Sequence, residues 1–294
     1  MTENLHKSKI VLGTVQFGLD YGINNRAGKV SQSEVDKILE FAYKNGVRAL
    51  DSAYNYGESE KVIGQFIRKS GLSFNIISKV PKTDEKSIQK YLDTSLKNLG
   101  VKKLYGYLFH AFDSFKENPK LLDELIRLKK ESKINKIGFS LYYPEELEYL
   151  IENKIVCDIV QVPYSLLDQR FDRLFPTAKE LGIEIHTRSV FLQGLVFKDP
   201  ESLETRFLPI KKNLLELREL GTKTGLSISE LCLNFAAVNP HIDRLVIGVD
   251  SLANLADNVD SLLASKAKLA EGVYTQLANL RCDDEEVILP TNWK

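Results

Sequence analysis

Short apolar runs alternate along the chain with longer segments whose apolar residues recur every three or four positions. Short runs rich in β-branched residues are typical of buried strands, and the longer spacing is typical of helices that cover a sheet. Eight strands are predicted in this way, at residues 9–12, 47–51, 75–78, 104–110, 136–139, 159–161, 184–187 and 244–247. Because they alternate with helices, these strands are expected to form a parallel sheet.

Capping residues mark the beginnings of several predicted helices. Ser31 and Glu34 have the spacing of a capping box, in which each side chain bonds the backbone of the other residue. Ser227 and Glu230 repeat this spacing, and Ser251 is expected to cap a further helix. Each of these residues stands at the boundary between a polar stretch and a periodic apolar segment, which supports the alternation of strands and helices.

The length of 294 residues suits a single α/β barrel, which typically holds about 250 residues. We therefore predict an α/β fold of the (β/α)8 TIM-barrel class as one domain over 1–294, with extra helices near 203–221 and 266–281. The alternative is an open, doubly wound sheet. Against it, the segment VLGTVQFG lacks the G-x-G-x-x-G spacing of a dinucleotide-binding turn, and the helix after it is expected only from about Ser31.

Charge and cysteine content narrow the range of partners. Basic and acidic residues both number 40, so no net charge would attract nucleic acid or an anionic membrane, and a small molecule fits better. Cys157, Cys232 and Cys282 lie far apart, in a spacing that suits neither a metal site nor a disulfide framework. They indicate a reducing compartment. No apolar run approaches the ~18 residues of a membrane span, so we expect a cytoplasmic protein.

Ionisable residues end three successive predicted strands. Asp51 ends the second strand, Lys79 follows the third and His110 ends the fourth. In parallel barrels the carboxyl ends of the strands surround the active site. Tyr56 lies five residues after Asp51, in a loop that can fold over the same opening. The sequence therefore predicts that all four residues share one site.

These four residue types together suit proton transfer. A tyrosine with a pKa near 10 is a poor acid at neutral pH unless a cation stabilises its phenolate. Lys79 can supply that charge, because two unit charges ~4 Å apart interact by roughly 4 kcal/mol at an effective dielectric of 20. Asp51 would hold Lys79 in place. His110 could donate a hydrogen bond to a carbonyl oxygen.

Each residue also has a structural explanation. Asp51 could cap a turn, Lys79 could be a surface charge, Tyr56 could pack within its loop, and His110 could be a core histidine. The combination of all four at successive strand ends favours a catalytic site.

The sequence resembles the aldo-keto reductases in the segments GTVQFG, LDSAYNYGESEKVIG, ISK, FH, IGFS and IVQVPYSLLDQR, which occur in order over most of the chain. The resemblance implies a (β/α)8 barrel that transfers a hydride between NAD(P)H and an aldehyde, ketone or sugar-like carbonyl. It implies a catalytic tetrad of Asp51, Tyr56, Lys79 and His110, with Tyr56 as the general acid.

The resemblance also implies a cofactor site. Ser140 and Gln161 fall at the carboxamide contacts, although Leu141 stands where the family usually has asparagine. Arg188 falls at the position that stacks on the nicotinamide ring, and Ser189 near the pyrophosphate. The remaining cofactor residues implied are Thr14, Gly248, Asp250, Asn254 and Asn258.

The resemblance favours NADPH as the cofactor, because basic residues of the family commonly bind its 2′-phosphate. In the corresponding segment this chain carries Asp250, Asn254 and Asp257. Acidic groups disfavour a phosphate and suit a free ribose diol, so the local residues favour NADH. Asp250 could equally be an exposed acid at a helix N-terminus.

We expect four aromatic residues on strand-end loops to line the substrate pocket, and they are Phe17, Tyr54, Phe112 and Tyr142. Two other functions are considered. Leu141 raises the hypothesis of a regulatory barrel that binds nicotinamide but has little turnover. Lys79 raises that of an aldolase-type Schiff base.

Overall fold

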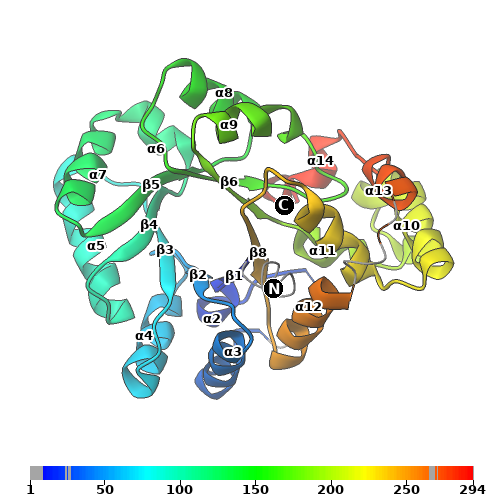
Figure 1. Ribbon diagram of the computed structural model, residues 1–294, viewed down its shortest axis with the longest axis horizontal. Helices are drawn as coiled ribbons and strands as arrows, with labels where there is room; N and C mark the ends of the chain where they lie inside the picture. Colours follow the sequence, from blue (N-terminus) through cyan, green and yellow to red (C-terminus); the bar gives the residue numbers. More distant parts are fainter. Residues whose placement is uncertain (1–8, 24, 26–27, 265–268, 270, 294) are drawn as a thin grey trace.

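Eight parallel strands close into one barrel in the computed structural model, which describes residues 9–23, 25, 28–264, 269 and 271–293 (Figure 1). The strands are β1 Ile10–Gly13, β2 Ala49–Asp51, β3 Asn75–Val80, β4 Leu104–Phe109, β5 Ile134–Ser140, β6 Ile159–Pro163, β7 Glu184–Arg188 and β8 Arg244–Gly248. Each strand pairs with the next along the chain, and β8 pairs with β1 to close the sheet. The predicted fold class is confirmed, and each predicted strand end lies within two residues of the observed one.

Helices surround the strands (Figure 1). The α-helices are α2 Val15–Gly18, α3 Gln32–Lys44, α4 Ser59–Ser70, α5 Glu85–Leu99, α6 Phe112–Glu117, α7 Lys120–Lys130, α8 Pro144–Glu152, α9 Phe175–Glu180, α10 Lys211–Thr224, α11 Ile228–Val238, α12 Leu252–Ala264, α13 Glu271–Ala278 and α14 Glu285–Ile288. Short 3₁₀ helices are η1 Asp172–Leu174, η2 Leu192–Phe197, η3 Pro200–Ser202, η4 Thr205–Ile210 and η5 Pro290–Asn292. Within the described residues, no helix combines the length and apolar character needed to cross a bilayer.

The predicted caps form, with one difference. Ser227 and Glu230 make both bonds of a capping box at the start of α11. At α3, Ser31 accepts from the backbone of Glu34, but the Glu34 carboxylate instead accepts from the backbone N–H of Leu252. Tertiary packing thus uses Glu34 to join α3 to the start of α12, where sequence spacing predicted a local bond.

The extra helices differ from their predicted bounds. The segment 203–221 begins with η4, and the regular helix α10 begins only at Lys211, because Pro209 has no backbone N–H to donate. The second extra helix, predicted at 266–281, is α13, although 265–268 and 270 lie outside the described residues. One helical turn, α2, also follows β1 directly, earlier than the predicted start near Ser31.

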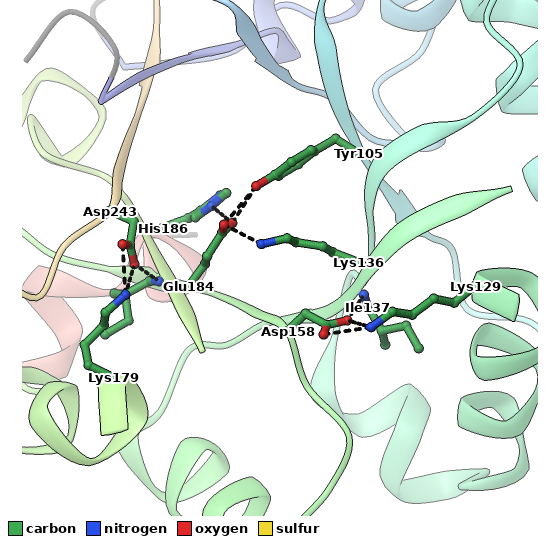
Figure 2. Close-up of polar contacts among 10 residues, drawn as sticks. Tyr105, Lys129, Lys136, Ile137, Asp158, Lys179, Glu184, His186 and Asp243 are labelled. Carbon is green, nitrogen blue, oxygen red and sulfur yellow. Dashed lines mark hydrogen bonds and ion pairs between the residues drawn. The ribbon is translucent and has the colours of Figure 1, made fainter. Parts of the chain in front are cut away.

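The barrel interior holds a small apolar layer between two polar ends. That layer consists of Val11, Ala49, Ile77, Leu108 and Ile159, with Tyr105 and Val246 packed against it. A much larger apolar layer fills the space between the strands and the helices. Polar side chains occupy the interior at the amino ends of the strands (Figure 2) and again at their carboxyl ends. The carboxyl end contains the candidate active site.

Candidate active site

The four residues predicted to act together do lie together, at the carboxyl ends of β2, β3 and β4. Asp51 is the last residue of β2 and Lys79 the penultimate residue of β3. His110 directly follows β4, and Tyr56 lies in the loop between β2 and α4. Parallel strands point their carboxyl ends to the same rim, which is why residues up to 59 positions apart converge here.

Lys79 is the centre of the site's hydrogen-bond network. Its Nζ lies 2.6 Å from Asp51 Oδ2, 2.9 Å from the carbonyl oxygen of Ser52 and 3.5 Å from Tyr56 Oη. The Lys79 and Asp51 side chains are 1% and 4% exposed. Gln161 Nε2 donates to the other Asp51 oxygen at 2.7 Å. Both Asp51 oxygens are therefore engaged, and Lys79 has one acceptor for each of its three protons.

These contacts set the protonation states. Burial raises the pKa of Tyr56 above its ordinary value of 10, and the opposing effect of Lys79 is smaller. The predicted net lowering of the Tyr56 pKa is therefore not found, because burial outweighs the Lys79 charge and Asp51 acts in the same direction as burial. Burial acts to lower the pKa of Lys79, but Asp51 and Tyr56 together raise it. Tyr56 thus holds its proton and Lys79 its charge at neutral pH.

His110 is a neutral imidazole at physiological pH. Burial lowers its pKa to about 4, and the nearby charge of Lys79 acts in the same direction. Its ring meets the Tyr56 ring edge to face, with centroids 5.8 Å apart. A neutral imidazole can still donate one N–H, so His110 can bond a substrate oxygen without adding charge.

A cavity of about 480 Å³ opens over these residues. Its lining includes Asp51, Tyr56 and His110, together with every residue predicted to bind the cofactor: Thr14, Ser140, Gln161, Arg188, Ser189, Gly248, Asp250, Asn254 and Asn258. The predicted cofactor residues come from distant parts of the chain and share one continuous wall. Lys79 is absent from this wall and is bonded to three acceptors, so it is not the accessible free amine that a Schiff-base mechanism requires.

Comparison with known proteins identifies the family. The model of the aldo/keto reductase family matches residues 9–279. The chain belongs to the aldo-keto reductases. It is 24% identical over 282 residues to an aldo-keto reductase of Strobilurus tenacellus, covering 87% of this chain and 83% of that protein. It is 25% identical over 288 residues to the L-glyceraldehyde 3-phosphate reductase of Escherichia coli K12, covering 83% of each.

Comparison with solved structures agrees with the fold expected of this family. An aldo-keto reductase from Bacillus halodurans, solved in its holo form, superposes with a TM-score of 0.74 at 18% identity and covers 92% of this chain and 91% of that chain. Family and fold together make this aldo-keto reductase an NAD(P)H-dependent oxidoreductase.

The lining of this cavity offers polar groups that fit a nicotinamide dinucleotide. Gln16 lies in the lining, and its Oε1 is buried with no hydrogen-bond partner among the described residues. A Cβ added at Gly248 would lie 2.9 Å from the Gln16 side-chain amide, so glycine keeps this part of the wall open without a shift of Gln16. An unpartnered acceptor beside a wall without a side chain fits a polar ligand that lies against it.

Three of the four predicted substrate contacts are not part of this cavity. Phe17 is completely buried in the core. Tyr54 packs edge to face on Tyr91 of α5, with centroids 4.8 Å apart. Phe112 packs in an aromatic cluster with Phe115 and other rings. Burial against the helix layer thus directs these side chains away from the cavity.

Tyr142 does line the cavity, and three aromatic residues that were not predicted join it. Tyr21 comes from the loop between α2 and α3, and Phe191 and Phe197 come from the segment that follows β7. Gln193 Nε2 donates to Tyr21 Oη at 2.9 Å, which connects these two loops. Neither loop shows a periodic apolar pattern in the sequence. Only the folded structure shows that both loops contribute to the cavity wall.

Proposed function

We propose that this aldo-keto reductase reduces an aldehyde, ketone or sugar-like carbonyl and that Tyr56 is its general acid. One observation carries the proposal. Tyr56 has its hydroxyl 3.5 Å from the Lys79 ammonium at the cavity wall, while both Asp51 oxygens are bonded elsewhere. Among the described residues, no carboxylate therefore accepts the Tyr56 proton, which remains available to a bound carbonyl.

The residues divide the reaction between them. The reduced nicotinamide, when bound, supplies a hydride to the carbonyl carbon. Tyr56 transfers its proton to the carbonyl oxygen and becomes a phenolate, and Lys79 stabilises that negative charge. Asp51 keeps Lys79 charged and in position. His110, neutral because of its lowered pKa, donates a hydrogen bond that orients the carbonyl oxygen.

We further propose that the cofactor is NADH. Ser140 and Gln161 would hold the carboxamide, without the help of a side-chain amide at Leu141. At the other end of the cavity the described lining residues include Asp250 and Asp257, with no lysine or arginine after β8. Asn254 donates to the Asp250 carboxylate and so holds this acid in the wall. An acidic wall repels a 2′-phosphate and can accept from a ribose hydroxyl.

Tyr56→Phe tests the catalytic assignment. Loss of the proton donor should lower kcat by 10²- to 10⁴-fold, the usual contribution of general acid catalysis, with little change in cofactor affinity. The control is Tyr54→Phe, because Tyr54 lies two residues away and packs on α5 outside the cavity. Steady-state turnover on a panel of carbonyls measures both variants. Full turnover in Tyr56→Phe would overturn the assignment.

A fluorescence titration with NADH and NADPH tests the cofactor assignment. We expect tighter binding of NADH, and we expect Asp250→Asn to reduce the difference because it removes one negative charge from the wall. Tighter binding of NADPH by the unmodified protein would contradict the assignment and would leave the role of Tyr56 untouched.

A further inference from the structure

Arg188 places a positively charged guanidinium in the cavity wall. Its Nη2 donates to the carbonyl oxygen of Leu141 at 3.0 Å, and its Nη1 lies 3.4 Å from Ser189 Oγ. Its Cζ lies 4.3 Å above the centre of the Tyr142 ring. Over the described residues, no acidic group forms an ion pair with Arg188. The guanidinium is thus held by neutral partners.

Asp250 and Asp257 line the cavity after β8, and two other acids near the strand ends are bonded to groups other than Arg188. Asp51 is bonded to Lys79 and Gln161. Glu146 accepts from the backbone N–H groups of Tyr142 and Tyr143 at the start of α8. Arg188 is also the one lysine or arginine among the described lining residues. Its field therefore acts directly on whatever occupies the middle of the cavity.

The proposed function places the nicotinamide ring in that middle part. A hydride donor must come within about 3.5 Å of a carbonyl carbon whose oxygen is bonded by Tyr56. The ends of β5, β6 and β7 lie on the same rim of the barrel, and their residues Ser140, Gln161 and Arg188 line the cavity together with Tyr56. Arg188 exerts its field on both Tyr56 and His110, which places its charge within reach of the reacting groups.

The oxidised and reduced rings differ in charge. The ring is neutral before hydride transfer and carries one positive charge afterwards, and the phosphates and riboses stay the same. A cation beside the ring therefore destabilises the oxidised form and leaves the reduced form nearly unchanged. A flat aromatic side chain at this position would not produce that difference, because the negative face of an aromatic ring attracts cations.

Resting on the proposed function, we propose that Arg188 makes this site select the reduced cofactor over the oxidised one and promotes release of the oxidised cofactor after turnover. Arg188 thereby determines a redox-state specificity that is separate from the choice between NADH and NADPH.

The test is the ratio of two dissociation constants, that of NAD⁺ divided by that of NADH, measured by calorimetry without substrate. The ratio cancels every contact with the phosphates and riboses. We expect the unmodified protein to bind NADH at least tenfold more tightly than NAD⁺. Arg188→Gln should lower the ratio about tenfold, and Arg188→Lys, which retains the charge, should keep most of it. The matched control is Arg173→Gln, an exposed arginine paired with Glu148, which should leave the ratio unchanged.

The possible results distinguish failure of this inference from failure of the proposed function. An unchanged ratio in Arg188→Gln, or equal weakening of both forms, would show that Arg188 only contacts the cofactor and would overturn the inference. A ratio near one in the unmodified protein would do the same, with the proposed function intact. Failure of the unmodified protein to bind NADH, NADPH or their oxidised forms would instead overturn the proposed function and the inference with it.

Discussion

The two ends of the barrel interior contain the same four kinds of side chain in different arrangements. At the carboxyl ends of the strands they are Asp51, Lys79, Tyr56 and His110. At the amino ends they are Glu184, Lys136, Tyr105 and His186 (Figure 2). We call these two groups the mouth cluster and the floor cluster. Both contain a buried or partly buried ion pair between a lysine and a carboxylate, with a tyrosine beside it.

The clusters differ in which residue is at the centre. In the floor cluster the carboxylate is central, because Glu184 accepts from Tyr105 Oη at 2.9 Å and 3.0 Å, from His186 Nε2 at 3.3 Å and from Lys136 Nζ. In the mouth cluster the lysine is central, and the tyrosine hydroxyl faces a cation. The proton of Tyr105 is thus already donated, whereas that of Tyr56 is available. The residue types alone therefore do not determine whether a tyrosine can donate its proton. The partner of its hydroxyl, a carboxylate or a lysine, determines it.

Further ion pairs strengthen the floor end. Lys129 bonds both oxygens of Asp158, which also accepts from the backbone of Ile137 on β5 (Figure 2). Lys179 bonds Asp243 in the same way, and Asp243 accepts from the backbone of β7. These acids tie loops and helices to the starts of strands. The floor of the barrel therefore supports the fold, as is usual for barrels whose chemistry lies at the opposite face.

The largest expected effect is a contrast between the two lysines. Lys79→Met should lower kcat/KM by roughly 10³-fold or more, because the Tyr56 phenolate loses its cation. It should also cost about 3–5 kcal/mol of stability, since Asp51 is left as an uncompensated buried charge. Lys136→Met should leave turnover within about twofold. The measurement is steady-state kinetics of both variants, with circular dichroism to confirm that each is folded. A loss of kcat/KM in Lys136→Met comparable to that in Lys79→Met would contradict the different roles of the two lysines.

The next effect concerns stability at the floor. The bonds from His186, Lys136 and Tyr105 outweigh burial, which acts to raise the pKa of Glu184, and lower it to about 2. From an ordinary value of 4.5 this corresponds to at most about 3 kcal/mol at 1.36 kcal/mol per unit. Because the side chain is 23% exposed, solvent screening should reduce the effect, and we expect Glu184→Gln to lose about 2 kcal/mol at pH 7 with turnover intact.

The pH dependence gives that variant a sharper readout. A carboxylate whose pKa is lowered on folding stabilises the protein fully above its unfolded pKa near 4.5, and this stabilisation is lost as the pH falls towards 2. Urea unfolding curves of the unmodified protein and Glu184→Gln should therefore converge between pH 5 and pH 2. Curves that stay equally far apart at pH 3 would show that Glu184 acts by packing rather than by charge.

The smallest effect concerns His110. Since its pKa is lowered to about 4, first by burial and then by Lys79, the imidazole stays neutral through the physiological range. The pH profile of kcat/KM should be flat within about twofold between pH 5.5 and 7.5. An acid limb near pH 6.5 that disappears in His110→Asn would mean that the mouth is more solvated than its geometry shows.

Much of the fold follows from local patterns in the sequence. Each strand coincides with a short apolar run, because a parallel barrel buries both faces of its strands. The capping box of Ser227 and Glu230 needs only residues three apart, so it is visible before folding. The convergence of Asp51, Lys79 and His110 was predictable for a related reason, since all strands of a parallel barrel end at one rim.

Contacts between distant segments needed the tertiary structure. Gln161 bonds Asp51 across 110 residues, and this bond helps to direct Asp51 towards Lys79. Tyr105 reaches Glu184 across 79 residues and so became part of a structural cluster instead of a catalytic one.

Sequence position likewise placed Phe17 and Tyr54 near the mouth, yet packing against the core and α5 directs them away. Which residue types stand at each end of the strands is encoded locally, because chain direction decides it. Which of them donate, accept or remain free depends on side chains from other strands and helices, and only the closed barrel brings those within bonding distance.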